Sequence, residues 1–182
     1  MQINKKDFIN ILEEHNKLGF QEQIDYKKFY LYSIVTHSTA IEGSTMTEID
    51  NQLLFDEGLS AKGKSIIEQN MNLDLKAAYE RSMELAKVHT PISVGVLKHL
   101  ASLVMRRTGG EVNGFGGSFD SSRGDLRLVN VTAGAGGKTY MNYLKVPQKL
   151  EDFCKEINER RKELLESPDI YEQYKLSFYA HL

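Results

Sequence analysis

Apolar residues recur three or four positions apart over most of the chain, and this spacing predicts amphipathic helices. Glycine and proline interrupt the pattern at a few places only, where they mark the ends of the helices. The predicted helices span residues 7–18, 25–42, 46–57, 64–87, 92–107, 147–164 and 170–182. The last pattern runs to the end of the sequence without a stop signal, so we expect the chain to be cut from a longer protein.

The pattern changes between residues 109 and 146. Residues 109–124 hold six glycines and three serines, which is typical of a loop. Residues 126–131 then alternate in the way of a strand, residues 132–138 form a glycine-rich turn, and residues 139–143 fit a return strand. The sequence therefore predicts a mainly α fold with one β-hairpin.

Charge and composition exclude several classes of protein. The net charge of −2 lacks the basic surplus of a nucleic-acid binder. No apolar stretch is long enough to span a bilayer, and no signal peptide precedes the first helix, so we expect no membrane partner and a cytoplasmic location. The single cysteine, Cys154, lies on an apolar helix face and is expected to pack there. The five histidines show no metal-site spacing, so no metal ligand is predicted.

The turn that ends Gly137-Lys138-Thr139 has some features of a phosphate-binding loop, because it is rich in glycine and follows a predicted strand. A loop of that kind needs glycine at position 132, where Thr132 stands, and a long helix directly after the lysine. The residues that follow favour β-structure instead. A nucleotide site at this turn is kept as an alternative.

The end of the helix 25–42 carries an acid in an unusual place. Gly43 stands where a helix commonly needs a left-handed residue, and Glu42 therefore sits at the C-terminal end, where the helix dipole favours cations. Ser38 lies one turn earlier on the same face and is placed to hydrogen-bond the Glu42 carboxylate. A solvated surface acid is the simple interpretation, and a cation from elsewhere in the protein is the alternative.

The run from His37 to Gly58 closely resembles the inhibitory motif Ser/Thr-x-x-x-Glu-Gly/Asn of Fic-domain proteins that carry it before their core. The resemblance implies that Ser38, Glu42 and Gly43 form this motif. Glu42 would pair with an arginine of the family's catalytic motif and obstruct the site of the ATP γ-phosphate.

Two later segments extend the resemblance. Gly124-Asp125-Leu126-Arg127 and the predicted hairpin resemble the family's flap, although Leu126 replaces the more usual tyrosine. The resemblance implies a target-binding edge that pairs with the main chain of a target peptide, formed by Val129, Asn130, Val131 and Tyr140. The last helix resembles the one that leads into the catalytic motif His-Pro-Phe, which lies beyond the end of this chain, so His181 is expected to have a packing role.

The resemblance implies a Fic-like helical bundle, with N-terminal helices that include the inhibitory helix in residues 1–60 and an incomplete Fic core in residues 61–182. The full-length protein would be an autoinhibited AMP transferase that uses ATP and Mg²⁺ to modify a serine, threonine or tyrosine hydroxyl of a target protein. This chain would contain no catalytic residue and need no cofactor alone, and a homo-oligomer is possible. The alternative is a non-catalytic regulatory or peptide-binding module that uses the hairpin edge.

Overall fold

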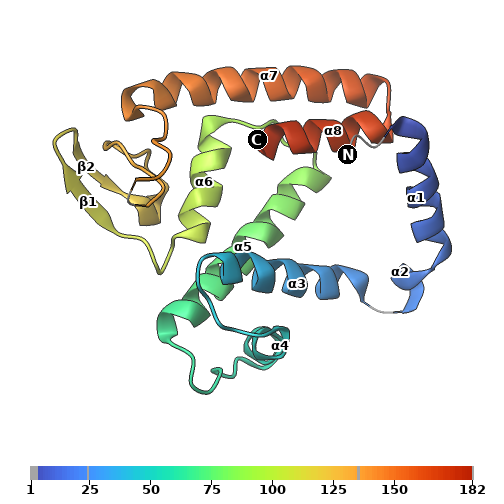
Figure 1. Ribbon diagram of the computed structural model, residues 1–182, viewed down its shortest axis with the longest axis horizontal. Helices are drawn as coiled ribbons and strands as arrows, with labels where there is room; N and C mark the ends of the chain where they lie inside the picture. Colours follow the sequence, from blue (N-terminus) through green and yellow to red (C-terminus); the bar gives the residue numbers. More distant parts are fainter. Residues whose placement is uncertain (1–3, 24, 135, 182) are drawn as a thin grey trace.

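A computed structural model describes residues 4–23, 25–134 and 136–181 of the chain. Its described part is mainly α-helical with one two-stranded antiparallel sheet, which confirms the fold class predicted from the sequence (Figure 1). The helices are α1 (Lys5–Lys17), α2 (Phe20–Gln23), α3 (Tyr26–Ile41), α4 (Glu48–Glu57), α5 (Ile66–Lys87), α6 (Val94–Val104), α7 (Val146–Glu166) and α8 (Ile170–His181). Of these, only the short α2 was not expected.

The hairpin lies earlier in the chain than predicted. Strands β1 (Glu111–Gly114) and β2 (Gly117–Asp120) pair with Val112 opposite Phe119, inside the segment predicted to be a loop. A short 3₁₀ helix, η1 (Ser121–Arg123), follows β2. The segment predicted to form the hairpin contains one isolated bridge, between Thr132 and Thr139, and no regular strand in its described part.

The Arg127 side chain bridges the two halves of this irregular segment. Its guanidinium donates to the Val129 carbonyl at 2.6 Å and also to the Met141 carbonyl. A second 3₁₀ helix, η2 (Tyr143–Lys145), follows and leads into α7. Ala135, at the predicted turn, lies outside the described residues.

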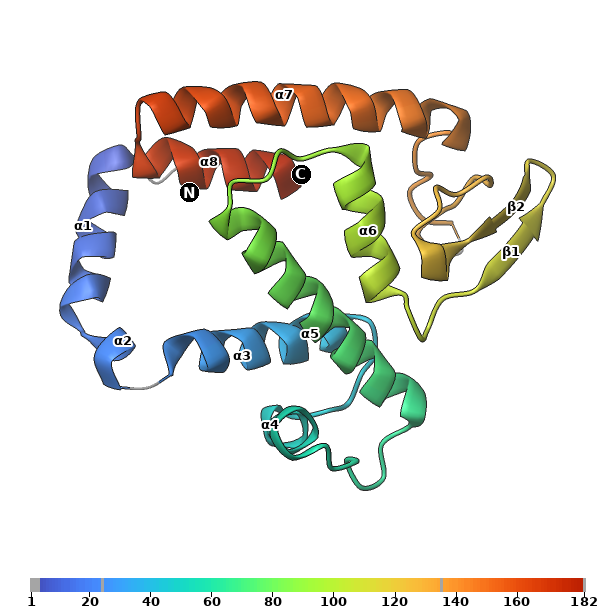
Figure 2. The same ribbon diagram turned by 180° about the vertical axis from the view of Figure 1, so that it is seen from behind.

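The helices form an open frame. α7 and α8 lie side by side along one edge, α1 runs from α8 toward α3, and α5 crosses the frame and packs against both α3 and α6 (Figures 1 and 2). The corner between α1 and α8 is closed by the Phe8 ring, whose centroid is 5.0 Å from that of Tyr174, and by an ion pair between Lys5 and Asp169.

The apolar core lies where α3, α4 and α5 meet. Met46, Leu54 and Ala61 are buried there, and Phe55 and Leu73 pack against them. A second buried group lies on α7 and contains Cys154 and Ile157. The expected packing place of Cys154 is thereby confirmed, and burial raises the pKa of its thiol.

Helix α4 begins two residues later than the sequence indicated. Its capping box joins Thr47 to Asp50, with Asp50 N and Thr47 Oγ1 3.2 Å apart. Thr45 is engaged elsewhere, because its backbone N–H donates to Glu68 at 2.8 Å. The second capping box, between Ser65 and Glu68, opens α5.

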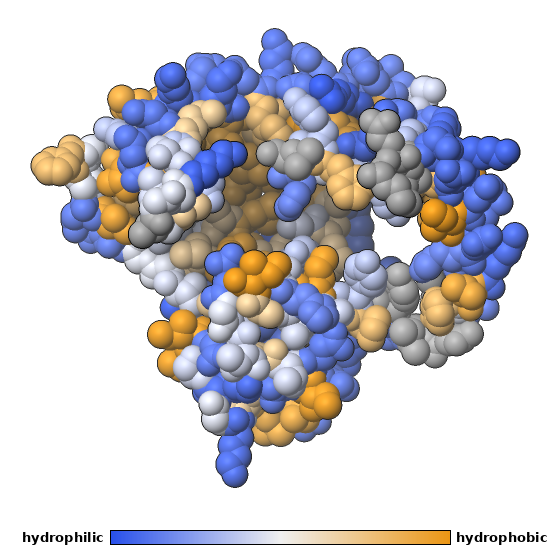
Figure 3. All heavy atoms as spheres, viewed as in Figure 1, coloured by the Kyte–Doolittle hydropathy of each residue, from blue (hydrophilic) through white to orange (hydrophobic). Residues whose placement is uncertain are grey.

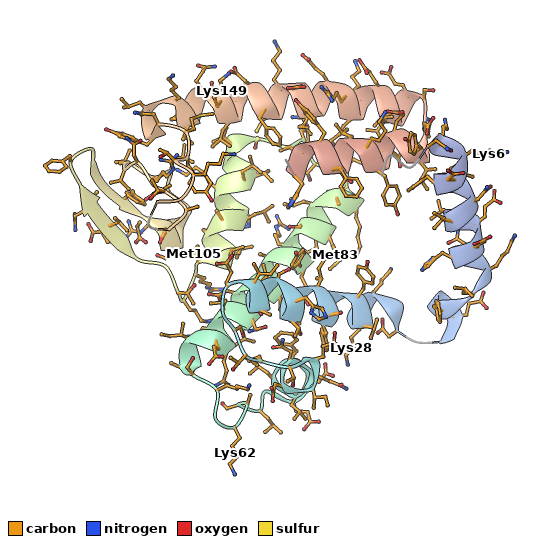
Figure 4. All side chains as sticks on the ribbon, in the orientation of Figure 1. Lys6, Lys28, Lys62, Met83, Met105 and Lys149 are labelled. Atoms are coloured by element: carbon orange, nitrogen blue, oxygen red, sulfur yellow. The ribbon has the colours of Figure 1, made fainter. Side chains whose placement is uncertain are left out.

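Two concave regions border α3. Lys28 on α3 and Met83 on α5 line the same groove of about 880 Å³ between these helices (Figure 4). The face seen in Figure 3 is hollowed between the upper helices and α3, and apolar residues form part of its wall. The C-terminal end of α3 lies at the lower border of this hollow (Figures 1 and 3).

The boundary at residue 60, between the N-terminal helices and the incomplete Fic core, stays a prediction.

Candidate functional site

The last turn of α3 and the turn that follows it contain the three residues of the predicted inhibitory motif. Glu42 caps the helix, and its backbone N–H donates to the Thr39 carbonyl at 3.1 Å. Gly43 has a φ of +93°, which confirms the left-handed residue expected at this position. Ser44 N then donates to the same Thr39 carbonyl at 3.0 Å, so the chain reverses within two residues of the end of the helix.

The carboxylate of Glu42 points into solvent. Glu42 is exposed, and within residues 4–23, 25–134 and 136–181 no hydrogen bond or ion pair reaches its carboxylate. The bond expected from Ser38 does not form in this structure; Ser38 is half-buried one turn earlier. The neighbouring His37 lies 3.4 Å from a carboxylate oxygen of Glu48 instead of approaching Glu42. The carboxylate is therefore available to a cation from outside the described part of the chain.

Buried polar side chains form hydrogen bonds with residues on both sides of this turn. Asn72 of α5 is fully buried; its Oδ1 accepts from Thr39 Oγ1 at 2.8 Å, and its Nδ2 donates to Ser44 Oγ at 3.1 Å. Asn51 of α4 donates to Asn72 Oδ1 and to Thr36 Oγ1, both at 2.8 Å. We call these five residues, Thr36, Thr39, Ser44, Asn51 and Asn72, the polar cluster. It joins three helices directly below the Glu42 turn.

One buried atom of the polar cluster lowers the stability that the cluster provides. Asn51 Oδ1 is buried and has no hydrogen-bond partner among the described residues. A buried acceptor without a partner forfeits its hydration, which costs about 1–3 kcal/mol in typical proteins. An apolar cluster of the same volume would avoid this cost.

Glu68 holds the segment that follows the turn. Its carboxylate accepts from Thr45 N at 2.8 Å, Thr45 Oγ1 at 2.7 Å, Ser65 N at 2.9 Å and Ser65 Oγ at 2.8 Å. These hydrogen bonds favour the charged form, led by the one from the Thr45 backbone, and lower the pKa of Glu68 to about 2. The chain leaving Gly43 is thus fixed at Ser44 by the polar cluster and at Thr45 by a carboxylate.

We expect the stabilising effect of Glu68 to disappear in acid. Its folded pKa of about 2 lies below the ordinary value of 4.5, so its contribution is complete above pH 4.5 and is lost as the pH falls toward 2. Urea unfolding of the wild type and Glu68→Gln should show a larger difference in unfolding free energy at pH 6 than at pH 3. A difference that stays constant between these pH values would contradict the assignment.

The predicted target-binding edge is an irregular, largely exposed ribbon. Tyr140 N donates to the Val131 carbonyl at 3.1 Å, and the Asn130 side chain accepts from Tyr143 N at 3.1 Å. Asn130, Val131 and Tyr140 are exposed and Val129 is half-buried. The four residues lie together as the sequence predicted, but on an irregular segment joined by a single bridge.

The structure contradicts the phosphate-loop alternative. The residues after Gly137-Lys138-Thr139 are irregular, and helix α7 begins only at Val146. A phosphate loop needs a helix N-terminus directly after the lysine, because its backbone N–H groups and dipole hold the phosphate.

Across the described ranges, no helix is long and apolar enough to cross a membrane.

The chain was compared with protein families, curated proteins and solved structures. No protein-family model matches the sequence, and no curated protein matches it. Among solved structures, the chain is similar to Fic-1 (residues 134–508) from C. elegans, with 22% identity over 71% of this chain and a TM-score of 0.48. The match covers 34% of that chain, so the present chain spans about a third of it.

Proposed function

We propose that this chain is the regulatory and scaffold part of a Fic-like protein AMP transferase, in which Glu42 holds the enzyme inactive. The motif Ser38-x-x-x-Glu42-Gly43 and its following helix support the family. The reaction would transfer AMP from ATP to a serine, threonine or tyrosine hydroxyl of a target protein. The hydroxyl oxygen attacks the α-phosphorus and loses its proton to a base, and pyrophosphate leaves with the electrons of the broken P–O bond.

The observation that carries the proposal is the free carboxylate of Glu42 on a fixed turn. The carboxylate lies at a helix C-terminus, where the backbone dipole disfavours it by a few tenths to about 1 kcal/mol. A cation at this position offsets that cost. An arginine suits the position best, because its planar fork binds both oxygens of a carboxylate. In the proposed enzyme this arginine belongs to the catalytic motif, and its pair with Glu42 keeps the γ-phosphate out.

ATP and Mg²⁺ belong to the proposal for the longer protein. The described residues contain no group of three or more histidine, cysteine, aspartate or glutamate side chains able to hold a metal ion. No step is therefore assigned to the ion in this chain. What this chain supplies is the inhibitory carboxylate, the helical frame and the ribbon.

The ribbon is the proposed contact to the target. Its residues Val129, Asn130, Val131 and Tyr140 are close together and mostly exposed. A target segment in extended conformation can pair with exposed main-chain groups there, which requires little of the target sequence.

Replacing Glu42 by glycine tests the proposal. In the longer protein with an intact catalytic motif, Glu42→Gly should raise AMP transfer at least tenfold, because the γ-phosphate site is no longer obstructed. A tenfold rise corresponds to about 1.4 kcal/mol of activation free energy. The measurement is incorporation of labelled AMP into protein, for wild type and variant side by side.

Glu57→Gly is the matched control, because it makes the same substitution at the end of α4. It should leave AMP transfer unchanged. Equal transfer by wild type and a folded Glu42→Gly protein would make Glu42 a surface acid and remove the regulatory assignment.

A further inference from the structure

An inhibitory carboxylate must be held in one place. In the described part of this structure, no contact to the Glu42 side chain holds it there. Neither Ser38 nor any other described residue binds the Glu42 carboxylate. The position of Glu42 therefore depends on its backbone. That backbone lies between Thr39, which accepts from both Glu42 N and Ser44 N, and Ser44 itself.

Asn72 bridges these two points. Its Oδ1 accepts from Thr39 Oγ1 at 2.8 Å on the near side of the turn, and its Nδ2 donates to Ser44 Oγ at 3.1 Å on the far side. The amide is anchored within its own helix, because Nδ2 also donates to the Glu68 carbonyl at 2.8 Å. Asn72 has no exposed surface, so water does not compete for these bonds.

We infer that Asn72 is a positioning residue for Glu42, which sets the direction of the inhibitory carboxylate from helix α5. A side chain that contacts both Thr39 and Ser44 restrains the four residues between them, which include Glu42. A shift of α5 relative to α3 would break one of the two contacts and release the turn. This inference rests on the proposed function of Glu42 as far as regulation is concerned, whereas the restraint itself follows from the contacts of Asn72.

Amide hydrogen exchange on this chain tests the restraint without any activity. Asn72→Leu keeps the branching and the number of side-chain heavy atoms, and it removes both contacts. The Ser44 amide, measured relative to the Ile157 amide in the core of α7, should exchange at least tenfold faster than in the wild type. The reference amide corrects for any general loss of stability.

Asn158→Leu is the matched control. Asn158 of α7 accepts from Ile92 N at 2.9 Å and donates to Ile92 O at 2.6 Å, so it also joins a helix to another segment, away from the Glu42 turn. This variant should leave the exchange rate of the Ser44 amide itself unchanged. Equal Ser44 exchange rates in the Asn72 and Asn158 variants would overturn the inference.

A smaller substitution tests the same restraint if the Asn72→Leu protein does not fold. Ser44→Ala removes only the far contact of Asn72 and the 3.3 Å bond from Met46 N. It should release the turn in the same direction, with at least threefold faster exchange at the Gly43 amide relative to Ile157. An unchanged ratio in this variant would also contradict the restraint.

AMP transfer in the longer protein separates restraint from regulation. Asn72→Leu should raise transfer at least threefold in the wild-type background and not at all in the Glu42→Gly background, because it acts through Glu42. An equal rise in both backgrounds would refute the positioning role. If Glu42→Gly itself raised nothing, the proposed function would fail, while the exchange ratios would still decide whether Asn72 restrains the turn.

Discussion

Replacing Asp74 by alanine is expected to lower the free energy of unfolding by about 3 kcal/mol, at the lower end of the range for breaking a buried ion pair. Asp74 of α5 has no exposed surface. Its Oδ2 accepts from Arg107 N at 2.7 Å, and its Oδ1 accepts from the Arg107 guanidinium. Alanine would leave a backbone N–H without its partner and a cation beside the core. The Arg107 side chain is 43% exposed and can turn to water, which limits the loss.

Urea unfolding at neutral pH measures this effect. The control is Asp152→Ala on α7, whose carboxylate pairs with Lys149 at 3.5 Å, with both side chains more than half exposed. Such a surface pair contributes little, so the control should stay within about 0.5 kcal/mol of the wild type. A loss below about 1 kcal/mol for Asp74→Ala would show that the pair does not join the end of α6 to α5.

Replacing Gly124 by alanine should cost about 2 to 5 kcal/mol. Gly124 has a φ of +70°, where any other L-residue loses about 1–2 kcal/mol. It also ends η1 directly against α6, where an added Cβ would lie 1.9 Å from the Lys98 carbonyl oxygen and 3.0 Å from Ser102 N. Both atoms belong to a helix backbone, so relief requires moving η1 away from α6, and overpacking of this kind typically costs a further 1–3 kcal/mol.

Gly58→Ala is a closely matched control for Gly124→Ala. Gly58 has a φ of +68°, and nothing lies within 4 Å of its added Cβ. The control should therefore lose only the conformational part, about 1–2 kcal/mol. Thermal or urea unfolding of the two variants gives the difference. Equal losses would mean that the approach of η1 to α6 is not tight in solution.

The hydrophobic pattern identified the long helices because each buries one face. Spacing and the absence of glycine and proline predicted residues 64–87, and α5 spans Ile66–Lys87. The same reasoning placed the end of α3 next to Gly43 and the end of α4 at Gly58. These signals are local, since they depend on backbone conformation and periodicity within one segment.

The hairpin shows where local signals were insufficient. β1 is exposed along its whole length and β2 over half of it, so neither has the alternation of buried and exposed positions that marks a strand. Residues 126–131 alternate in sequence, but in the structure residues 126–129 are all half-buried and residues 130 and 131 are exposed. Which positions of a segment become buried depends on its tertiary neighbours, which the order of residues within the segment does not state.

The sequence by itself determined the helices, the turn at Glu42 and Gly43, and the resemblance from which its role is proposed. The tertiary structure decided what fixes that turn. Asn51 and Asn72 belong to different helices, and polar residues within a helical pattern ordinarily indicate an exposed face. Only the packing of α3, α4 and α5 brings Asn72 to Thr39 and Ser44, and Asn51 to Thr36 and Asn72, where hydrogen bonds compensate most of the cost of burying the two amides.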